Sequence, residues 1–269
     1  MDNNFFRSWN VRYIDEPQFS GTMRISRSDG NTNVRGNILR DGVPDGSYVS
    51  TSASFPSNSR LEFNFRLATG DTGKVQLDLR EIQVGGIVTA VSASGRYQDD
   101  GGGDTGRIEL SPIFPNAANI GDNFTYSPSI IASHQATLEE RHRFAYGQIN
   151  VCGNLSNQQK EALRIAYTRQ IDHDINTTPG VNASAFVGGN QIFVNFDVLF
   201  PQGDQEIAQT LIHEMMHCAG YTHPVRMAGD TPGDGGPYYS TPPLQSEICI
   251  AGVQSDKACE MIDGQCTIK

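Results

Sequence analysis

The sequence predicts an α+β protein with two parts, an N-terminal antiparallel β-sandwich-like domain and a C-terminal domain organised around helices. Short alternating apolar stretches, separated by Gly, Asn, Asp and Ser clusters, dominate the region before residue 111. A segment rich in Pro, Asn and Ser follows, and helical periodicity appears only beyond it. We therefore expect a β-rich domain at 1–115, a linker at 116–133 and a second domain at 134–269.

The N-terminal strands are predicted by period-two alternation of apolar and polar residues. The clearest examples are Leu61–Leu67, Val75–Leu79, Gly86–Val91 and Arg107–Leu110. Turn signals between strands are Asp29-Gly30, Asp41-Gly42 and Asp45-Gly46. These strands carry no catalytic motif, so we expect an accessory, binding or pro-domain role for this half.

The second half alternates between helix and strand signals. Ser156 with Gln159 forms a capping-box pattern before a helical apolar repeat. Gln191–Phe196 is typical of a strand, and a second helix is predicted to begin near Asp204. A Gly- and Pro-rich loop follows Gly220, and Leu244–Val253 is a short helical candidate.

Composition and charge exclude several classes of partner. The 20 basic and 30 acidic residues give a net charge of -10, which argues against nucleic acid as a partner. No apolar run is long enough for a transmembrane segment, and the opening residues do not resemble a signal peptide. Five cysteines lie in the second half, and the crowding of Cys249, Cys259 and Cys266 favours a disulfide-pinned tail and a secreted or extracellular protein.

The segment His213-Glu214-Met215-Met216-His217 carries the chemistry of a metal site. On a helix, positions i and i+4 share one face, so both imidazoles can reach one ion. Neutral imidazole is a Zn²⁺ ligand, and the adjacent Glu214 can accept a proton from water. Gly220 permits the chain to leave the helix, which lets His223 return as a third ligand.

The eleven residues from His213 to His223, HEMMHCAGYTH, resemble the long signature of the metzincin zinc metallopeptidases. The resemblance implies a zincin-like domain, Zn²⁺ bound by His213, His217 and His223, and Glu214 as general base. It also implies a protein or peptide substrate, and the strand at Gln191–Phe196 resembles the edge strand that holds it. The methionine turn of the clan is matched by Met227 or Met261, and neither is preferred.

Several alternatives stay open. A resemblance to gluzincins would make Glu247 the third zinc ligand in place of His223. Tyr238 or Tyr239 is a candidate to stabilise the oxyanion, or both pack structurally. His134, His142 and His173 lack ligand spacing and are expected at the surface or on helices.

We predict a zinc-dependent metalloendopeptidase, with a binding or adhesion protein containing a degenerate zincin domain as the alternative. A pro-segment role for the β half is also open.

Overall fold

The computed structural model describes residues 3–101, 104–116, 118–227, 229–255, 260–262 and 265–267. The chain divides into two compact units. The first contains Met1–Ile82, Ala90–Phe114 and Thr168–Gln170, and the second contains Gln83–Thr89, Pro115–Tyr167 and Ile171–Lys269. Each unit is described separately below.

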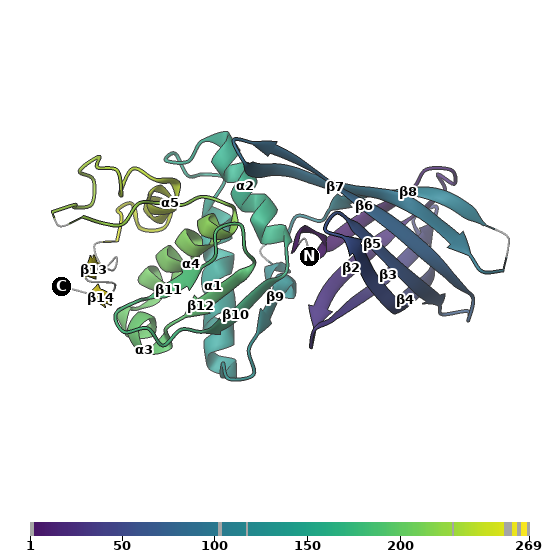
Figure 1. Cartoon of the computed structure of the whole chain (residues 1–269), viewed down its shortest axis with the longest axis horizontal. Coiled ribbons are helices and arrows are strands. Elements are labelled where there is room, and N and C mark those ends of the chain that lie inside the picture. Colours follow the sequence, from purple (N-terminus) through teal and green to yellow (C-terminus); the bar gives the residue numbers. More distant parts are fainter. Residues whose placement is uncertain are drawn as a thin grey trace. The chain divides into compact units, whose positions relative to one another are not determined.

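The first unit is a closed antiparallel barrel of eight strands that follow one another in sequence order (Figure 1). A short 3-10 helix, η1 (Asn3–Phe5), precedes it. The strands are β1 (Ser8–Tyr13), β2 (Phe19–Ser28), β3 (Asn31–Arg40), β4 (Val43–Ser57), β5 (Arg60–Leu67), β6 (Thr72–Val84), β7 (Ile87–Asp99) and β8 (Thr105–Pro112). Closure is made by β1 and β8, which pair antiparallel from Trp9 opposite Pro112 to Tyr13 opposite Ile108.

The predicted fold class, a sandwich-like domain followed by a zincin-like domain, is wrong. The N-terminal strands form one sheet that closes on itself, and no second sheet packs on it among the described residues of this unit. Alternation of apolar residues shows that each strand has one buried face. A sandwich and a barrel produce the same alternation, so the pattern does not distinguish between them. The pairing between the first and last strands is a long-range contact that alternation cannot reveal.

Two of the three predicted Asp-Gly turns named above are confirmed. Asp29 and Gly30 have φ angles of 50° and 77°, and Asp41 and Gly42 have 51° and 79°, as two-residue hairpin turns require. Asp45-Gly46 is instead part of β4. There Gly46 pairs with Ile38, next to an irregularity in the register between β3 and β4. Gly46 therefore lies within a strand and not in a chain reversal.

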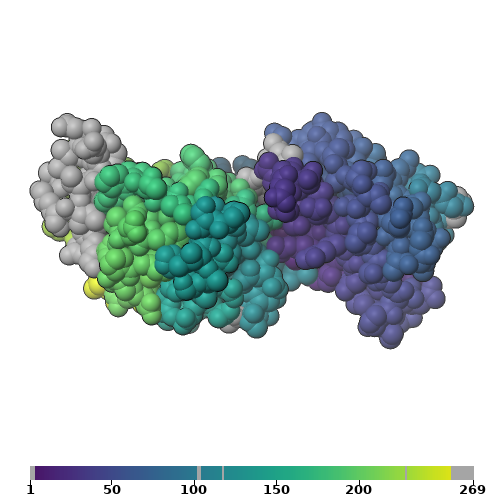
Figure 2. Space-filling view, turned by 90° about the horizontal axis from the view of Figure 1, so that it is seen from below, coloured from purple at the N-terminus to yellow at the C-terminus, as the bar shows by residue number. Residues whose placement is uncertain are grey.

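The barrel interior is filled at one end and hollow at the other. Along β5 the inward-facing residues change from Leu61 and Phe63, at 0% and 3% exposure, to the partly exposed Phe65 and Leu67. Trp9 is completely buried, and its indole N–H donates to the Phe5 carbonyl oxygen at 3.1 Å. In the space-filling view, purple and blue residues of the N-terminal strands lie side by side on the face shown (Figure 2).

Three aromatic rings of the interior each lie opposite a glycine on the neighbouring strand. The cross-strand pairs are Tyr48 with Gly36, Phe65 with Gly73 and Tyr97 with Gly106. A Cβ atom at any of these glycines would come within 2.4–2.6 Å of an atom of the facing ring. The glycines therefore let the rings lie against the backbone.

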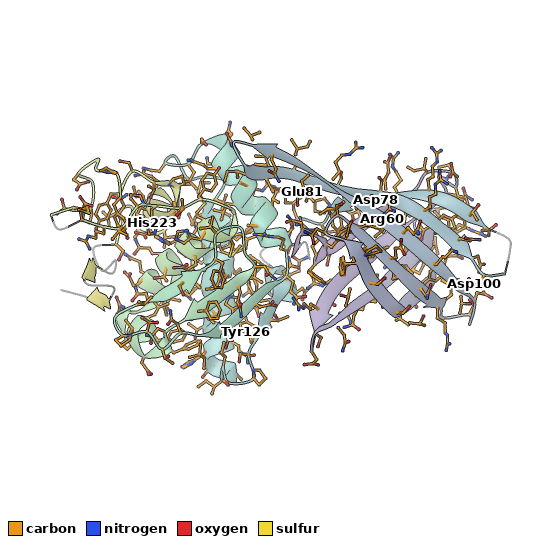
Figure 3. The ribbon with its side chains drawn as sticks, in the orientation of Figure 1. Arg60, Asp78, Glu81, Asp100, Tyr126 and His223 are labelled. Carbon is orange, nitrogen blue, oxygen red and sulfur yellow. A yellow bond between two sulfur atoms is a disulfide. The ribbon has the colours of Figure 1, made fainter. Side chains whose placement is uncertain are left out.

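The outer face of the barrel carries ion pairs in solvent. Arg60 and Asp78, labelled on adjacent strands in Figure 3, are 2.7 Å apart and about half exposed. Exposed pairs of this kind contribute about 0–1 kcal/mol, so the interior, not the surface charge, stabilises this unit.

The second unit contains helices and a four-stranded mixed sheet. The sheet has the order β11-β12-β10-β9, in which β10 is parallel to both β12 and β9, and β11 is antiparallel to β12. Its helices are α1 (Ala132–Gln148), α2 (Asn157–Thr168), α3 (Phe196–Leu199), α4 (Asp204–Cys218) and α5 (Pro242–Ala251), with the 3-10 turns η2 (Ile120–Asn123) and η3 (Phe200–Gln202). Its strands are β9 (Phe124–Tyr126), β10 (Ile171–Ile175), β11 (Ala183–Ala185), β12 (Gln191–Val194), and the hairpin β13 (Glu260–Ile262) and β14 (Gln265–Thr267).

The segment 116–133, predicted to be a linker, is grouped with the second unit. Ile120, Phe124 and Ile130 are 0%, 7% and 2% exposed, and Phe124–Tyr126 forms the edge strand β9. Its Pro, Asn and Ser content marks turns rather than a solvated connection, because the apolar residues between the turns are buried.

The predicted capping box of α2 is confirmed. The Ser156 backbone N–H donates to Gln159 Oε1 at 2.7 Å, and the Gln159 N–H donates to Ser156 Oγ at 3.3 Å. Leu163 and Tyr167 on this helix are completely buried in the core of the second unit. This core also contains Leu211 and Met215 from α4, so it supports the helix that carries the histidine motif.

A disulfide joins Cys152, which precedes α2, to Cys249 on α5. We predicted that Cys249 would take part in a disulfide-pinned C-terminal tail. Its partner is instead Cys152, far upstream of the tail. Cys259 and the side chain of Cys266 lie outside the described residues. The bond closes a loop with a sequence separation of 97 residues, which restricts the unfolded chain.

None of the described helices is long and apolar enough to cross a membrane.

Two histidines expected at the surface or on helices form a buried pair. His142 on α1 and His173 on β10 are 0% and 1% exposed, and their Nε2 atoms are 2.9 Å apart. The Nδ1 atom of His142 is 3.2 Å from the Tyr167 hydroxyl oxygen. Burial lowers the pKa of His173 to about 4 and moves the pKa of His142 in the same direction.

We expect this pair to make the second unit acid-sensitive. The folded-state pKa values lie below the ordinary value of about 6.5, so the unfolded chain takes up protons first. The stabilising contribution is complete above about pH 6.5 and is lost as the pH falls towards about 4, by about 1.4 kcal/mol per pH unit for each proton. Urea unfolding followed by circular dichroism at 222 nm measures this slope. His173→Gln should flatten it and His134→Gln should not; equal slopes in all three proteins would contradict the prediction.

We expect Gly36→Ala to destabilise the barrel by about 1–3 kcal/mol, because the new Cβ would lie 2.3 Å from the Thr22 carbonyl oxygen. Gly46→Ala is the matched control, since nothing lies within 4 Å of its Cβ position. Trp9, the single tryptophan, reports barrel unfolding by fluorescence. A Gly36→Ala protein as stable as the Gly46→Ala protein would show that Gly36 is not tightly packed against the Thr22 carbonyl oxygen and the Tyr48 ring.

Candidate metal centre

Helix α4 places two histidines on one face. It begins after Gly203, whose φ of 91° suits a residue without a Cβ atom, and Asp204 and Glu206 lie in its first turn. These carboxylates complement the partial positive charge at a helix N-terminus. Most residues from Glu206 to Cys218 are buried, and His213 and His217 are one turn apart on the face lining a cavity. The predicted second helix is thereby confirmed.

The helix ends in a Schellman motif. The Tyr221 N–H donates to the Met216 carbonyl oxygen at 3.0 Å, and the Gly220 N–H donates to the His217 carbonyl oxygen at 2.9 Å. Gly220 has a φ of 103°, in the region that favours glycine. The reversal brings His223 back towards the helix, as the sequence spacing predicted.

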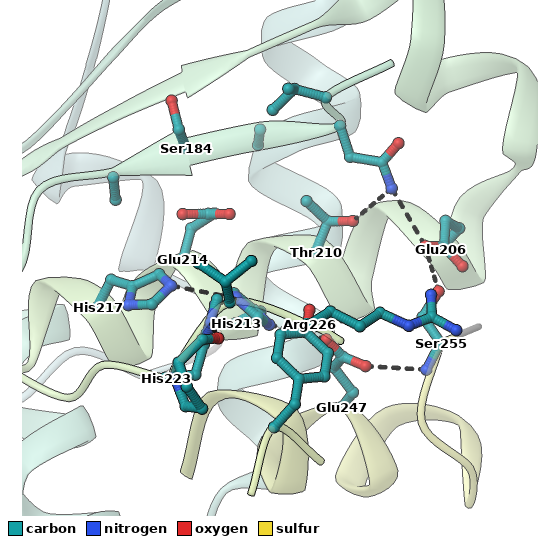
Figure 4. A pocket seen from close by; sticks show the side chains of 17 residues that line it. Ser184, Glu206, Thr210, His213, Glu214, His217, His223, Arg226, Glu247 and Ser255 are labelled. Carbon is teal, nitrogen blue, oxygen red and sulfur yellow. Dashed lines mark hydrogen bonds and ion pairs between the residues drawn. The ribbon is translucent and has the colours of Figure 1, made fainter. Parts of the chain in front are cut away.

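The three histidines converge through their Nε2 atoms (Figure 4). His213 Nε2 is 3.1 Å from His217 Nε2 and 3.2 Å from His223 Nε2. One ligand atom from each residue lies within 4.8 Å of the others. The three rings meet at inclined angles, with interplanar values from 53° to 71°, so their edges face a common point. This arrangement fits a single metal ion.

The opposite nitrogen of each imidazole is held by an oxygen acceptor. Nδ1 of His217 donates to the Tyr221 carbonyl oxygen at 2.9 Å, and Nδ1 of His223 donates to the Pro224 carbonyl oxygen at 2.9 Å. Nδ1 of His213 donates to Glu247 Oε1 at 2.8 Å. Because Nδ1 carries the proton, Nε2 carries a lone pair. Three lone pairs pointing at one another repel, and a cation between them removes that repulsion.

The charge state of the histidines also suits metal binding. Burial lowers the pKa of His213 and of His217 to about 3, and nearby histidines add to both shifts. Burial also lowers the pKa of His223. The rings are therefore neutral near pH 7, which is the form that coordinates Zn²⁺.

Glu247, considered from the sequence as a third zinc ligand, lies on the Nδ1 side of His213 rather than among the Nε2 atoms. It is 4% exposed, and its second oxygen accepts from the Ser255 N–H at 2.8 Å. A carboxylate that orients a ligating histidine in this way is common around metal sites. Sequence reasoning missed this orienting contact because no local spacing connects Glu247 with His213.

Glu214 is 5% exposed and lies between α4 and β11, as Figure 4 shows beside Ser184. The Ala185 backbone N–H donates to its carboxylate, and Oε2 has no hydrogen-bond partner among the described residues. Burial, followed by the charge of Glu247, raises its pKa to about 8. A buried carboxyl group with a pKa shifted towards neutral pH is a candidate for proton transfer.

A cavity of about 300 Å³ opens over these groups. It is lined by residues of α4, the loop after α4, the segment around β11 and α5, namely Val181–Ala185, Glu206, Thr210, His213, Glu214, His217, His223–Arg226, Tyr238, Glu247 and Ser255. The prediction that the strand at Gln191–Phe196 forms the edge of the sheet is wrong. This strand is β12, which lies between β11 and β10. The edge at this cavity is β11, which alternation over three residues could not predict.

The two candidate tyrosines have different positions. Tyr238 lines the cavity, and its ring centroid is 5.0 Å from that of His223. Tyr239 is 1% exposed and packs against Tyr238, so it is a core residue.

Neither candidate for the methionine turn is supported by the structure. Met227 is 67% exposed, which does not fit a methionine packed beneath a metal, and the side chain of Met261 lies outside the described residues. Cys218 is buried in the core of the second unit.

Comparisons with known proteins leave the function open. No protein-family model matches the chain, and no curated protein matches it. Among solved structures, a de novo designed fluorescence-activating β-barrel is similar, with 15% identity and a TM-score of 0.29. The match covers 41% of this chain and 97% of that chain. We draw no functional conclusion from it.

We expect Glu247→Gln to weaken zinc binding by about 10- to 100-fold, because the amide orients His213 less well than a carboxylate does. His223→Ala should weaken it much further. Competition with a chromophoric chelator measures both affinities, and Glu140→Gln on the exposed surface of α1 is the control. X-ray absorption of the zinc-loaded Glu247→Gln protein should show an unchanged nitrogen shell. Loss of an oxygen ligand in that variant would instead identify Glu247 as a direct ligand.

Proposed function

We propose that this chain is a zinc-dependent metalloendopeptidase. The observation that carries the proposal is the convergence of three neutral imidazole Nε2 atoms beside a buried carboxylate, in a cavity bordered by a sheet edge. The metzincin-like motif His213–His223 supports the same activity from the sequence. A structural zinc site would ordinarily have four protein ligands, and this group offers three.

His213, His217 and His223 would hold the zinc ion through Nε2. When bound, the ion would supply Lewis acidity towards water and towards the scissile carbonyl group. The Nδ1 hydrogen bonds of the three histidines fix their ring orientations before a ligand arrives. Glu247 as the third ligand is the less supported alternative, because its oxygen is engaged with Nδ1 of His213.

Glu214 is the proposed general base and acid. Its carboxylate would remove a proton from the attacking water and then deliver a proton to the leaving amine. Burial favours the protonated acid, and a nearby cation favours the carboxylate, so the two effects keep both forms accessible during turnover. Tyr238 lines the same cavity, and its hydroxyl group would donate a hydrogen bond to a developing oxyanion.

Strand β11 is the proposed docking edge for an extended peptide. Its outer side lines the cavity, and an added strand there would form main-chain hydrogen bonds that do not depend on substrate side chains. Phe186 and Val187, immediately after β11, are 67% and 55% exposed and offer apolar contact to such a substrate. The disulfide is compatible with an exported enzyme, which we propose as its setting.

We expect Glu214→Gln to keep zinc affinity and to lower casein cleavage by about 10²- to 10⁴-fold, since only the proton transfer is lost. Glu161→Gln on α2, a partly exposed carboxylate, is the matched control and should cleave as the unmodified protein does. His217→Ala should lose both zinc and cleavage.

Purified zinc-loaded protein is assayed with and without a chelator, and metal content is measured on each sample. Retained casein cleavage in Glu214→Gln would contradict the proposed mechanism. Intact casein in every tube containing fully zinc-loaded protein would contradict the proposed activity.

A further inference from the structure

The hollow end of the barrel is a cavity separate from the candidate metal centre. Its volume is about 320 Å³, at the lower end of the range for small-molecule sites. Every one of the eight strands contributes at least one lining residue, so the cavity is the lumen of the barrel rather than a surface groove. Part of its lining is aliphatic, and includes Ile38, Val75 and Ile108.

The walls are aromatic. Tyr13, Phe19, Tyr48, Phe65 and Tyr97 all line the cavity. The Tyr13 ring meets those of Phe19 and Tyr97 edge-on at centroid distances of 6.1 and 5.5 Å, and Tyr48 meets Phe65 edge-on at 6.1 Å. Edge-on packing leaves ring faces directed towards other groups. The lumen can therefore contact a flat ligand with several aromatic surfaces.

These walls are pre-organised. Tyr48, Phe65 and Tyr97 each occupy the space above a facing glycine, where a Cβ atom would collide with the ring. Glu16 also accepts a hydrogen bond from the Tyr97 hydroxyl. Rings held in this way lose little conformational freedom when a ligand binds, which favours affinity.

The mouth of the cavity has an acidic lining. Four carboxylates and one guanidinium line the cavity, from Glu16, Asp45, Asp99, Asp104 and Arg40. The guanidinium of Arg40 lies 4.8 Å from the centroid of the Phe19 ring and 3.9 Å from Asp45. The mouth thus already holds one cation between an aromatic face and a carboxylate. An anionic ligand would meet a net negative rim.

We propose that the barrel lumen binds a small planar aromatic amine in its cationic form. The ring would stack among the tyrosine and phenylalanine side chains, and the ammonium group would face Glu16 at the mouth. Aromatic faces and carboxylates both attract organic cations, whereas a neutral ligand of equal shape gains only the apolar contacts. The cavity is too small for a folded partner or a long lipid chain, so a compact molecule is its natural occupant.

Three indole derivatives of similar size test the proposal by isothermal titration calorimetry. Tryptamine is cationic, tryptophol is neutral and indole-3-acetate is anionic at pH 7. We expect saturable binding of tryptamine, at least about tenfold tighter than tryptophol, and weaker binding still of indole-3-acetate. Glu16→Gln keeps the shape of the side chain and should lower tryptamine affinity by about tenfold.

Glu62→Gln is the matched control, since it removes a carboxylate that pairs with Gln76 and does not line the lumen. Val75→Phe places bulk into the lumen and should abolish binding of all three compounds, with Trp9 fluorescence confirming that the barrel is folded. Absence of binding of all three to the unmodified protein, tightest binding of indole-3-acetate, or binding unchanged in both Glu16→Gln and folded Val75→Phe would each overturn the proposal.

Discussion

The convergence of three imidazole Nε2 atoms is the constraint around which the second unit is organised. Each ring is fixed from behind, by a backbone carbonyl for His217 and His223 and by Glu247 for His213. Such an arrangement is unfavourable for three neutral rings alone, because the Nε2 lone pair of His213 lies 3.1 and 3.2 Å from the Nε2 atoms of the other two rings. Helix α4, the turn at Gly220 and helix α5 all contribute to holding it. A cation bound between the three nitrogens would remove this repulsion.

Burial gives the surrounding groups their chemistry. The same dry environment that keeps His213 and His217 neutral also raises the pKa values of Glu214 and Glu247 to about 8. Two carboxylates with raised pKa values beside neutral histidines are costly without a positive charge. A cation bound by the three histidines would lower this cost, because it would favour the charged form of both carboxylates.

The main structural constraint on the first unit is the filling of the interior of a closed sheet. A closed sheet has no free edges, which avoids unwanted strand pairing, but closure leaves an interior that side chains must fill. Here the interior is packed around Trp9 and Leu61, and the other end is left open between aromatic rings seated over glycines. An open, rigid and aromatic lumen contributes less to stability than a filled one, so its retention is consistent with ligand binding.

Local patterns in the sequence determined several of the barrel strands, two Asp-Gly hairpin turns and the capping box at Ser156. They also determined the one-turn spacing of His213 and His217. Each of these features depends on residues a few positions apart. Tertiary structure alone decided that the N-terminal sheet closes between β1 and β8, that β11 is the cavity edge, that Cys152 pairs with Cys249, and that Glu247 orients His213. These features join residues that are distant in sequence. Packing and strand order determine which of these distant residues come into contact. Alternation and short-range spacing contain no information about packing or strand order.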